Sequence, residues 1–320
     1  MLKSDILHYS RQLSGSLDPW FENLLDDLID QQTYPDLNVL QQTGKKLEQE
    51  LISYSKLYNI NTVVVGLSGG VDSALTAALF KAAGWSVKPI LLPIKQNPAE
   101  TERALETAQA LGLSAEVIDL NKAYDSLLKE VRTYDPDVVK DPIRSGNLRV
   151  RLRMLTLYNL ASKFKGLVAS TDNFSELAAG FWTLHGDVGD LAPIQSLCKS
   201  WEVPKLAESY GVPESTVMAK PTDGLGISAG DEDQFGFSYL ELDLILLTLC
   251  SGIQPYTLEN VYSILNVPEH LTPKVKMILQ RIRNSVYKRN NPCNITHPYQ
   301  TQRFAGLAKL DSCLIKNTIK

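Results

Sequence analysis

The sequence is poor in cysteine and has no closely spaced cysteine pair. Four cysteines are scattered along the chain, with no CxxC pattern among them: Cys198, Cys250, Cys293 and Cys313. A zinc site or a disulfide framework would need closer or more regular spacing. The N-terminus, MLKSDILHYSRQ, also lacks the apolar core of a signal peptide. We therefore expect reduced thiols and a cytoplasmic protein.

Long apolar runs and an excess of basic charge are absent as well. No stretch approaches the roughly 18 apolar residues of a transmembrane helix. The longest candidate, residues 240–250, carries Glu241 and Asp243. Lysine and arginine number 32 against 36 aspartates and glutamates, giving a net charge of −4, which argues against a broad nucleic-acid-binding face. We expect neither a membrane nor a nucleic acid as a partner.

Apolar spacing predicts one domain of 320 residues with three parts. Residues 1–60 show helical spacing and form an arm, and residues 61–236 alternate between strands and helices. Expected strands cover residues 62–67, 87–92, 115–120 and 166–170, and expected helices cover residues 74–83, 100–111, 121–132 and 147–164. This alternation predicts an α/β fold, a doubly wound parallel sheet with helices on both faces. Ligands bind such sheets at the carboxyl ends of the strands.

The third part, residues 237–320, is expected to be helical. Helices are predicted near residues 238–249, 258–265 and 273–286, and the tail beyond Lys288 shows no clear pattern. Residues 221–236 are rich in Gly, Ser and Asp, so we expect them to be mobile without a ligand.

The most informative motif is GLSGGVDSAL, which directly follows the apolar run at residues 62–65. A strand, a glycine turn and a helix start expose backbone N–H groups and the positive end of a helix, which suit a phosphate. The glycines allow close approach of the chain, and Asp72 can reach a Mg²⁺ held by the same phosphates. Neither the Gly-Lys-Ser/Thr ending of a Walker A loop nor a GxGxxG turn is present. The predicted ATP-binding residues are Gly66, Leu67, Ser68, Gly69, Gly70, Val71, Asp72 and Ser73.

The string SGGVDS resembles the signature of the PP-loop ATP pyrophosphatases, which split ATP into AMP and pyrophosphate. The resemblance implies their adenine nucleotide alpha-hydrolase-like fold. The alternative is a glycine turn that only joins a strand to a helix, but such a turn does not need the Ser-Gly-Gly-x-Asp-Ser chemistry.

A second motif, at residues 170–194, reads STDNFSELAAGFWTLHGDVGDLAPI. Glu176 lies one turn into a new helix and can share a Mg²⁺ with the first motif, and Thr171 lies at the carboxyl end of the preceding strand. Asp187 and Asp190 occupy a loop punctuated by glycine; a core would not tolerate them unpaired. This segment resembles the ammonia-dependent NAD synthetases, whose pattern is close to GTDxxxExxxGFFTKYGDGGxDxxPL.

Further matches to that family follow in order along residues 45–292. They are GNLRVRLRM at 146–154, Tyr158, Lys199, KPT at 220–222, DEDQFGFSYLELD at 231–243 and YKR at 287–289. SGGxDS alone identifies the superfamily, whereas the ordered set is specific to the NAD synthetases.

The resemblance implies a two-step reaction. In that family, ATP adenylates the nicotinate carboxylate of deamido-NAD, and ammonia then displaces AMP to give NAD. Activation is needed because a carboxylate is a poor acyl donor. The resemblance implies Mg²⁺ on Asp72 and Glu176, and ATP contacts from Thr171 and Thr222. It also implies that Lys199 is a catalytic cation that binds ATP and neutralises the separating phosphoryl groups.

The resemblance also implies a substrate side of the site. Asp187 would position or deprotonate ammonia, or ligate the metal. The residues implied in binding deamido-NAD are Arg151, Tyr158, Leu184, Asp190, Tyr287 and Lys288. Arg149, Arg151 and Arg153 alternate along one helix, so we expect Arg151 to point to the site and the other two elsewhere. In the family, the lysine that matches Lys288 comes from the neighbouring subunit. The resemblance therefore predicts a homodimer with shared active sites.

Departures from the family pattern fall mostly on the dinucleotide side. The family's lysine before Tyr-Gly-Asp is Leu184, its tyrosine is His185, and the histidine of its His-Lys pair is Tyr287. The loop GDVGD is one residue shorter, and PTADL has become PTDGL. The lost cation predicts weaker binding of deamido-NAD or a preference for nicotinate mononucleotide. We do not expect His185 to bind a metal, because no second His or Cys lies within ligand spacing.

Three other functions fit parts of the sequence. A PP-loop tRNA-modifying enzyme would have a basic face and often CxxC pairs. A GMP-synthetase-like amidotransferase would bring a glutaminase with a nucleophilic cysteine, and no Cys-His-Glu arrangement is apparent, so we expect ammonia as the nitrogen donor. A non-catalytic nucleotide-binding module should have lost Asp72, Glu176 or Lys199, and all three are present.

Overall fold

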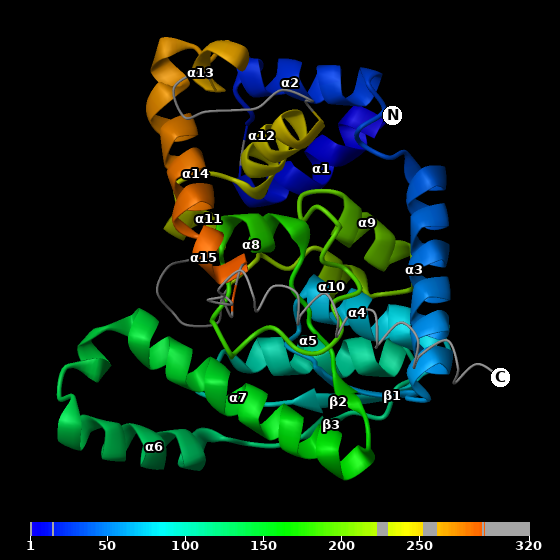
Figure 1. The fold of residues 1–320 in the computed structure, drawn as a ribbon, viewed down its shortest axis with the longest axis vertical. Helices are drawn as coiled ribbons and strands as arrows, with labels where there is room; N and C mark the ends of the chain where they lie inside the picture. The colour runs from blue at the N-terminus through cyan, green and yellow to red at the C-terminus, as the bar shows by residue number, and fades with distance from the viewer. Residues whose placement is uncertain (1, 15, 223–229, 252–260, 290, 292–320) are drawn as a thin grey trace, which may run out of the picture.

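A parallel four-stranded sheet carries the glycine turn of the first motif. The computed structural model describes residues 2–14, 16–222, 230–251, 261–289 and 291. The strand order is β3-β2-β1-β4, and all paired neighbours are parallel (Figure 1). The strands are β1 Thr62–Gly66, β2 Ser86–Leu91, β3 Glu116–Val117 and β4 Leu167–Val168. The predicted α/β fold with a parallel sheet is confirmed.

Helices make up most of the remaining described chain. The N-terminal helices are α1 Leu2–Ser14, α2 Pro19–Asp30 and α3 Leu37–Tyr58. Between the strands lie α4 Val71–Ala82, α5 Pro98–Ala110, α6 Asn121–Tyr134, the 3₁₀ turn η1 Val138–Lys140, and α7 Pro142–Phe164. After β4 come α8 Phe174–Ala179, α9 Glu202–Ser209, α10 Glu214–Val217, α11 Asp231–Phe235, α12 Tyr239–Ser251, α13 Val261–Ile264, η2 Glu269–Leu271, α14 Thr272–Asn284 and α15 Val286–Arg289.

Alternating residues of β1 belong to two separate apolar clusters. Val63 and Val65 pack in one cluster with Leu75 of α4. Val64 points the other way and packs in the second cluster with Leu157 of α7. Because side chains of a strand alternate between faces, β1 is buried by helices on both sides.

Two strands are shorter than predicted. β3 and β4 each pair over two residues, whereas strands were expected at 115–120 and 166–170. After β3, Asp119 accepts a backbone hydrogen bond at the start of α6 (2.8 Å), which ends the strand. After β4, the N–H of Ser170 donates to the carbonyl of Leu191 (2.7 Å), so the chain leaves β1 and pairs with a loop.

Two helices begin earlier than predicted because their N-caps extend them. Asp141 accepts hydrogen bonds from two backbone N–H groups (3.0 and 3.1 Å), and α7 begins at Pro142 instead of residue 147. Asn97 caps α5 in the same way (3.1 Å), so α5 begins at Pro98. Proline suits the first helical position because its missing N–H has no partner to lose there.

Several expectations concern segments that the structure describes only in part. Residues 258–260 of the helix predicted at 258–265, and residues 223–229 of the loop predicted to be mobile, lie outside the described residues. The tail after residue 291 does too, and with it Cys293 and Cys313. Cys198 and Cys250 are free thiols.

The N-terminal helices pack against elements from the second half of the chain. α2 contacts α12, and Phe21 and Leu25 of α2 are fully buried in the main apolar cluster. The indole N–H of Trp201 donates to the carbonyl of Pro35 (3.1 Å). The segment predicted as an arm therefore shares its core with α9 and α12.

No helix within the described ranges is both long and apolar enough to cross a membrane.

Leu25→Ala should destabilise the whole protein. Leu25 is 0% exposed, and replacing a buried leucine by alanine typically costs about 2–5 kcal/mol. The measurement is urea-induced unfolding followed by circular dichroism. Leu37→Ala is the control, since Leu37 is 42% exposed and such changes stay within about 0.5 kcal/mol. A separate early transition in Leu25→Ala, with the main transition unmoved, would contradict a shared core.

Candidate active site

The turn after β1 is shaped for close approach of a ligand. Gly69 has φ +87°, and a Cβ there would lie 2.2 Å from the carbonyl oxygen of Glu100. Only glycine fits both conditions. The Ser73 hydroxyl donates to the Gly70 carbonyl (3.0 Å) and accepts from the Ser68 N–H (3.2 Å). No described side chain caps α4 at Gly70, so the start of this helix suits a phosphate.

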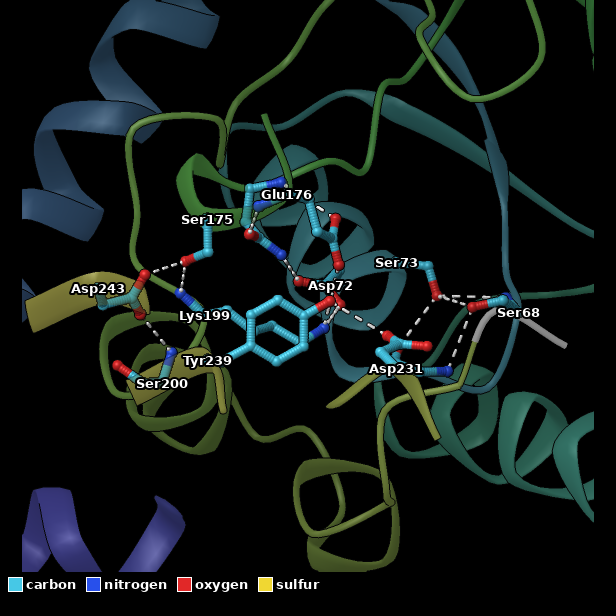
Figure 2. A network of polar contacts seen from close by, with 12 residues as sticks. Ser68, Asp72, Ser73, Ser175, Glu176, Lys199, Ser200, Asp231, Tyr239 and Asp243 are labelled. Atoms are coloured by element: carbon cyan, nitrogen blue, oxygen red, sulfur yellow. Dashed lines mark hydrogen bonds and ion pairs between the residues drawn. The ribbon is translucent and has the colours of Figure 1, made fainter. Parts of the chain in front are cut away.

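Asp72, Glu176 and Lys199 meet beside this turn (Figure 2). Lys199 Nζ contacts Oδ2 of Asp72 and lies 3.5 Å from Oε1 of Glu176. The lysine side chain is only 7% exposed. The three residues come from α4, α8 and the turn before α9. The structure thus brings together the two predicted metal ligands and the predicted catalytic cation.

The charges of this group depend on one another. Burial, and then the charge of Asp72, raise the pKa of Glu176 well above its usual value. Burial by itself would lower the pKa of Lys199, but Asp72 and Glu176 outweigh it and the pKa is raised. The ammonium of Lys199 therefore lies between the two carboxyl groups and opposes the rise in the pKa of Glu176.

The two carboxylates suit a Mg²⁺ that is also bound by phosphates. Within the described ranges, no group of three or more His, Cys, Asp and Glu is arranged to hold a metal ion. Mg²⁺ is commonly bound through one or two carboxylates, substrate phosphates and water. Asp72 and Glu176, at the edge of the glycine turn, match that requirement.

Asn173 orients both carboxylates, and sequence analysis missed it. Its side-chain amide donates to Oδ1 of Asp72 (2.8 Å), and its Oδ1 accepts from the N–H of Glu176 (3.0 Å). Glu176 bonds back to the N–H of Asn173 (3.5 Å), which completes a capping box. An asparagine three residues before a glutamate is the signal that could have revealed it.

A buried carboxylate on α12 fixes the backbone at Lys199. Asp243, which is 0% exposed, accepts hydrogen bonds from the Ser175 hydroxyl and from the N–H of Ser200 (3.0 Å). The Ser175 oxygen in turn accepts from the N–H of Lys199 (2.9 Å). Sequence analysis placed Asp243 within a family match but gave it no role, because the contact joins three elements that are far apart in the chain.

A second acid, which is half-buried, lies behind the same turn. Oε2 of Glu202 accepts from the N–H of Cys198 (2.6 Å). Burial raises the pKa of Glu202 to about 7 and that of Asp243 to about 6. The turn that carries Lys199 therefore rests on carboxyl groups that ionise less readily than usual.

The two predicted ATP-contacting threonines lie near the ends of the strands. Thr171 is half-buried after β4, between the buried residues Ser170 and Asp172. The Thr222 hydroxyl lies 3.4 Å from Oε1 of Glu100, the residue whose carbonyl faces Gly69.

The arginines of α7 alternate, as the spacing predicts. Arg151 is exposed, and its Nε donates to the carbonyl of Leu184 (3.2 Å). Arg149 is buried, and Arg153 donates to the carbonyl of Leu92 (3.0 Å), just beyond β2. This contact places Arg153 at the carboxyl end of β2, the edge of a parallel sheet at which ligands bind, and the expectation that Arg153 lies away from the site stays a prediction.

Asp187 lies half-buried in the loop after α8. Its Oδ2 accepts from the N–H of Thr183 (2.5 Å). Burial raises the pKa of Asp187, while the hydrogen bond from Thr183 and the charge of Arg153 oppose the rise. A carboxylate with a raised pKa is a better proton acceptor at neutral pH.

Asp190 and Tyr158 anchor the same loop to the sheet. The Tyr158 hydroxyl donates to Oδ1 of Asp190 (3.0 Å), and the N–H of Val168 donates to Oδ2 (2.8 Å). Both carboxylate oxygens of Asp190 therefore already have partners in its own chain. A substrate contact at Asp190 would have to coexist with this anchoring role.

Lys288 forms hydrogen bonds within its own chain, whereas the resemblance implies that it contributes to the active site of the neighbouring subunit. Its Nζ donates to the carbonyls of Gly180 (2.7 Å) and Trp182. α15 packs at the carboxyl end of α8, so Lys288 reaches this region from within the same chain. Tyr287 beside it is 64% exposed.

Comparison with known proteins gives the family. A family model described as NAD synthase matches residues 43–292. The chain belongs to the NAD synthase family. The matched region is close to the 45–292 predicted from the ordered motifs.

The relatives in sequence and in structure are NAD or NMN synthetases by name. The NH(3)-dependent NAD(+) synthetase of Finegoldia magna is 39% identical over 191 residues, covering 59% of this chain and 77% of the relative. That of Methanocaldococcus jannaschii is 37% identical over 241 residues, covering 73% and 88%. The structure of NMN synthetase from Francisella tularensis superposes with a TM-score of 0.67 at 26% identity, covering 81% of this chain and 98% of that one. The NH3-dependent NAD synthetase from Campylobacter jejuni gives 0.63 at 27% identity, covering 81% and 99%.

Membership in the NAD synthase family confirms the predicted family and the prediction of an enzyme, a carbon–nitrogen ligase. The family uses ATP as a co-substrate, which agrees with a phosphate-binding turn after β1. Membership in this family therefore argues against the two alternatives of a tRNA-modifying enzyme and a non-catalytic nucleotide-binding module.

Glu202→Gln should make stability less dependent on pH. The pKa of Glu202 is about 7 in the folded protein, so the folded state binds this proton more tightly than the unfolded state does. Its contribution to stability is present below the ordinary carboxyl pKa and is lost as pH rises through about 7. Glutamine keeps an acceptor for the Cys198 N–H but does not ionise. We expect Tm to fall less for the variant than for the unmodified protein between about pH 5 and pH 8.

The control is Glu102→Gln, at an exposed position on α5. It should follow the pH dependence of the unmodified protein in the same thermal unfolding measurements. Equal pH dependence in Glu202→Gln and in the unmodified protein would show that Glu202 does not carry this effect.

Proposed function

We propose that this protein is an ammonia-dependent NAD synthetase that converts deamido-NAD to NAD with ATP and Mg²⁺. The observation that carries the proposal is Lys199 held between Asp72 and Glu176 beside the glycine turn. This arrangement offers one cation for phosphates and two carboxylates for a metal. The names of the curated relatives support the same activity.

In the first step, a nicotinate carboxylate oxygen attacks the α-phosphorus of ATP and pyrophosphate leaves. The glycine turn would bind the phosphates through its N–H groups, and Asp72 and Glu176 would hold Mg²⁺. When bound, Mg²⁺ neutralises the phosphates and lowers the cost of the charge that develops on them. The Lys199 ammonium stabilises charge on the separating phosphoryl groups, and this stabilisation is greatest in the transition state.

In the second step, ammonia attacks the carboxyl carbon of the adenylate, and AMP leaves with the electrons of the broken C–O bond. The nitrogen gives up a proton as the amide forms. We assign that proton to Asp187, whose pKa burial raises. Arg153, whose charge opposes this rise, keeps the carboxylate ionised and ready to accept the proton.

Nicotinate mononucleotide is the second candidate substrate. Leu184 stands where the family pattern has a lysine, and it is half-buried in the loop after α8. A structural neighbour of this chain is named an NMN synthetase. The smaller substrate would not need a cation for the second nucleotide.

We further propose that the chain is a single catalytic domain that acts as a cytoplasmic homodimer. Ile143 and Leu155 on α7 are 56% and 69% exposed. A C2 pair would bury such side chains against the same surface of a second copy. Light scattering at assay concentration tests this association.

The products of a single incubation test the proposed reaction. With ATP, Mg²⁺, ammonium and deamido-NAD, mass spectrometry should detect NAD, AMP and pyrophosphate. Glutamine in place of ammonium should give little product. Lys199→Met, as the control, should remove turnover because the cation at the phosphates is lost. ADP with phosphate, or amidation of nicotinate mononucleotide alone, would contradict the proposal.

Leu184→Lys should improve the use of deamido-NAD. A charge-assisted contact is worth about 1.5–3 kcal/mol, which corresponds to roughly tenfold or more in affinity. We expect a lower KM for deamido-NAD and an unchanged KM for ATP in steady-state assays. Val117→Lys is the control, since it adds the same charge at a residue that is 50% exposed on β3. Unaltered kinetics in Leu184→Lys would show that residue 184 does not contact the substrate.

A further inference from the structure

α8 is a very short helix that carries one of the proposed metal ligands. It spans six residues, Phe174–Ala179, and it carries Glu176. The capping box with Asn173 holds its first turn at the carboxylate pair. A helix of fewer than about 12 residues is not stable by itself, so the other end of α8 must also be held.

Side chains from α14 and α15 bind the carbonyl groups at that other end. Arg289 Nη1 donates to the carbonyl of Ala178 (2.7 Å), and it lies 3.4 Å from that of Leu177. Arg281 Nε donates to the carbonyl of Ala179 (2.9 Å). The Ser285 hydroxyl donates to Ala178 as well (2.9 Å). In Figure 1, α14 and α15 lie against α8.

The packing between these helices leaves no spare room. Gly180 ends α8 with φ +62°, and a Cβ there would lie 2.2 Å from Cβ of Ser285. The same Ser285 accepts a hydrogen bond from Arg289 Nη1 (2.8 Å). Arg289 is therefore fixed by α14 on one side and by α8 on the other.

Two features of α8 require that side chains hold its carboxyl end. The last carbonyls of any helix lack partners within the helix, and cations near them are favourable. In addition, Glu176 lies 3.5 Å from the ammonium of Lys199, which also contacts Asp72, and a displacement of α8 away from α4 would break this contact. Cations that hold the far end of α8 oppose this displacement.

We propose that Arg281 and Arg289 are positioning residues that clamp α8 so that Glu176 stays beside Asp72. The inference rests on the proposed role of Glu176 in binding the metal. The two arginines act through the backbone of α8, to whose last carbonyl groups they donate. The YKR segment of the family match thereby gains a role for its arginine.

The test is metal binding by the full chain, measured without turnover. Mn²⁺ replaces Mg²⁺, an ATP analogue with a methylene bridge between the α and β phosphates replaces ATP, and free Mn²⁺ is read by electron paramagnetic resonance. Arg289→Gln should weaken Mn²⁺ binding by about tenfold or more, as changes to groups that orient metal ligands commonly do. Arg283→Gln is the matched control, because Arg283 is exposed on the same helix as Arg281. It should bind Mn²⁺ as the unmodified protein does.

Two further variants separate the possible outcomes. Arg289→Lys keeps the charge and one donor for Ala178, so it should recover part of the lost affinity. If Arg289→Gln does not fold, Ser285→Ala removes a single bond to α8 and should still weaken Mn²⁺ binding measurably. Arg289→Gln with a lower Tm but unchanged Mn²⁺ affinity would overturn the clamp.

Glu176→Gln distinguishes failure of the clamp from failure of the proposed metal site. If Glu176→Gln weakens Mn²⁺ binding and Arg289→Gln does not, the clamp alone is wrong. If Glu176→Gln has no effect, Glu176 is not a metal ligand, and both the metal assignment and the clamp are overturned.

Discussion

The structure around the site depends on one electrostatic constraint: two partly buried carboxyl groups share a single ammonium group. Asp72 and Glu176 would repel each other without Lys199, and they in turn raise the pKa of the lysine against the effect of its burial. None of the three groups is stable at this position alone. The hydrogen bonds of Asn173 and the backbone bonds around Asp243 keep all three in place. The same arrangement prepares the protein for a divalent cation, because a preformed pair of carboxylates need not be gathered when that cation arrives.

Sequence analysis succeeded where the chemistry is contiguous. The glycine turn, its serines and Asp72 lie within one short segment after β1, and local rules suffice to assign them to a phosphate. The strand and helix alternation gave the parallel sheet for the same reason. Asp243 and Asn173 were missed as supports, because their function arises from contacts between α4, α8 and α12. The contact of Arg153 with the carbonyl of Leu92 was not foreseen either, since helical spacing tells which residues share a face but not what that face meets.

The substrate side is less simple to assign, because several residues there already serve the fold. Asp190 ties its loop to β4, and Lys288 binds carbonyls at the end of α8. A family pattern transfers the identity of a residue but not its partners, and the partners decide what remains available to a ligand. The change at Leu184 lies in the same loop, whose backbone is held by the side chains of Arg151 and Asp187. A change of residue in this loop therefore acts on a backbone that side-chain bonds also shape.

The contacts behind Lys199 also bear on how the protein folds. Trp201 bonds to a residue 166 positions earlier, Lys199 pairs with one 127 positions earlier, and Ser200 bonds to one 43 positions later. Contacts of such long sequence separation form slowly, because long loops must close first. On the ribosome, the lysine-bearing turn stays incomplete until α12 has emerged. The nascent chain thus completes the group of Asp72, Glu176 and Lys199 only after α12 has been synthesised.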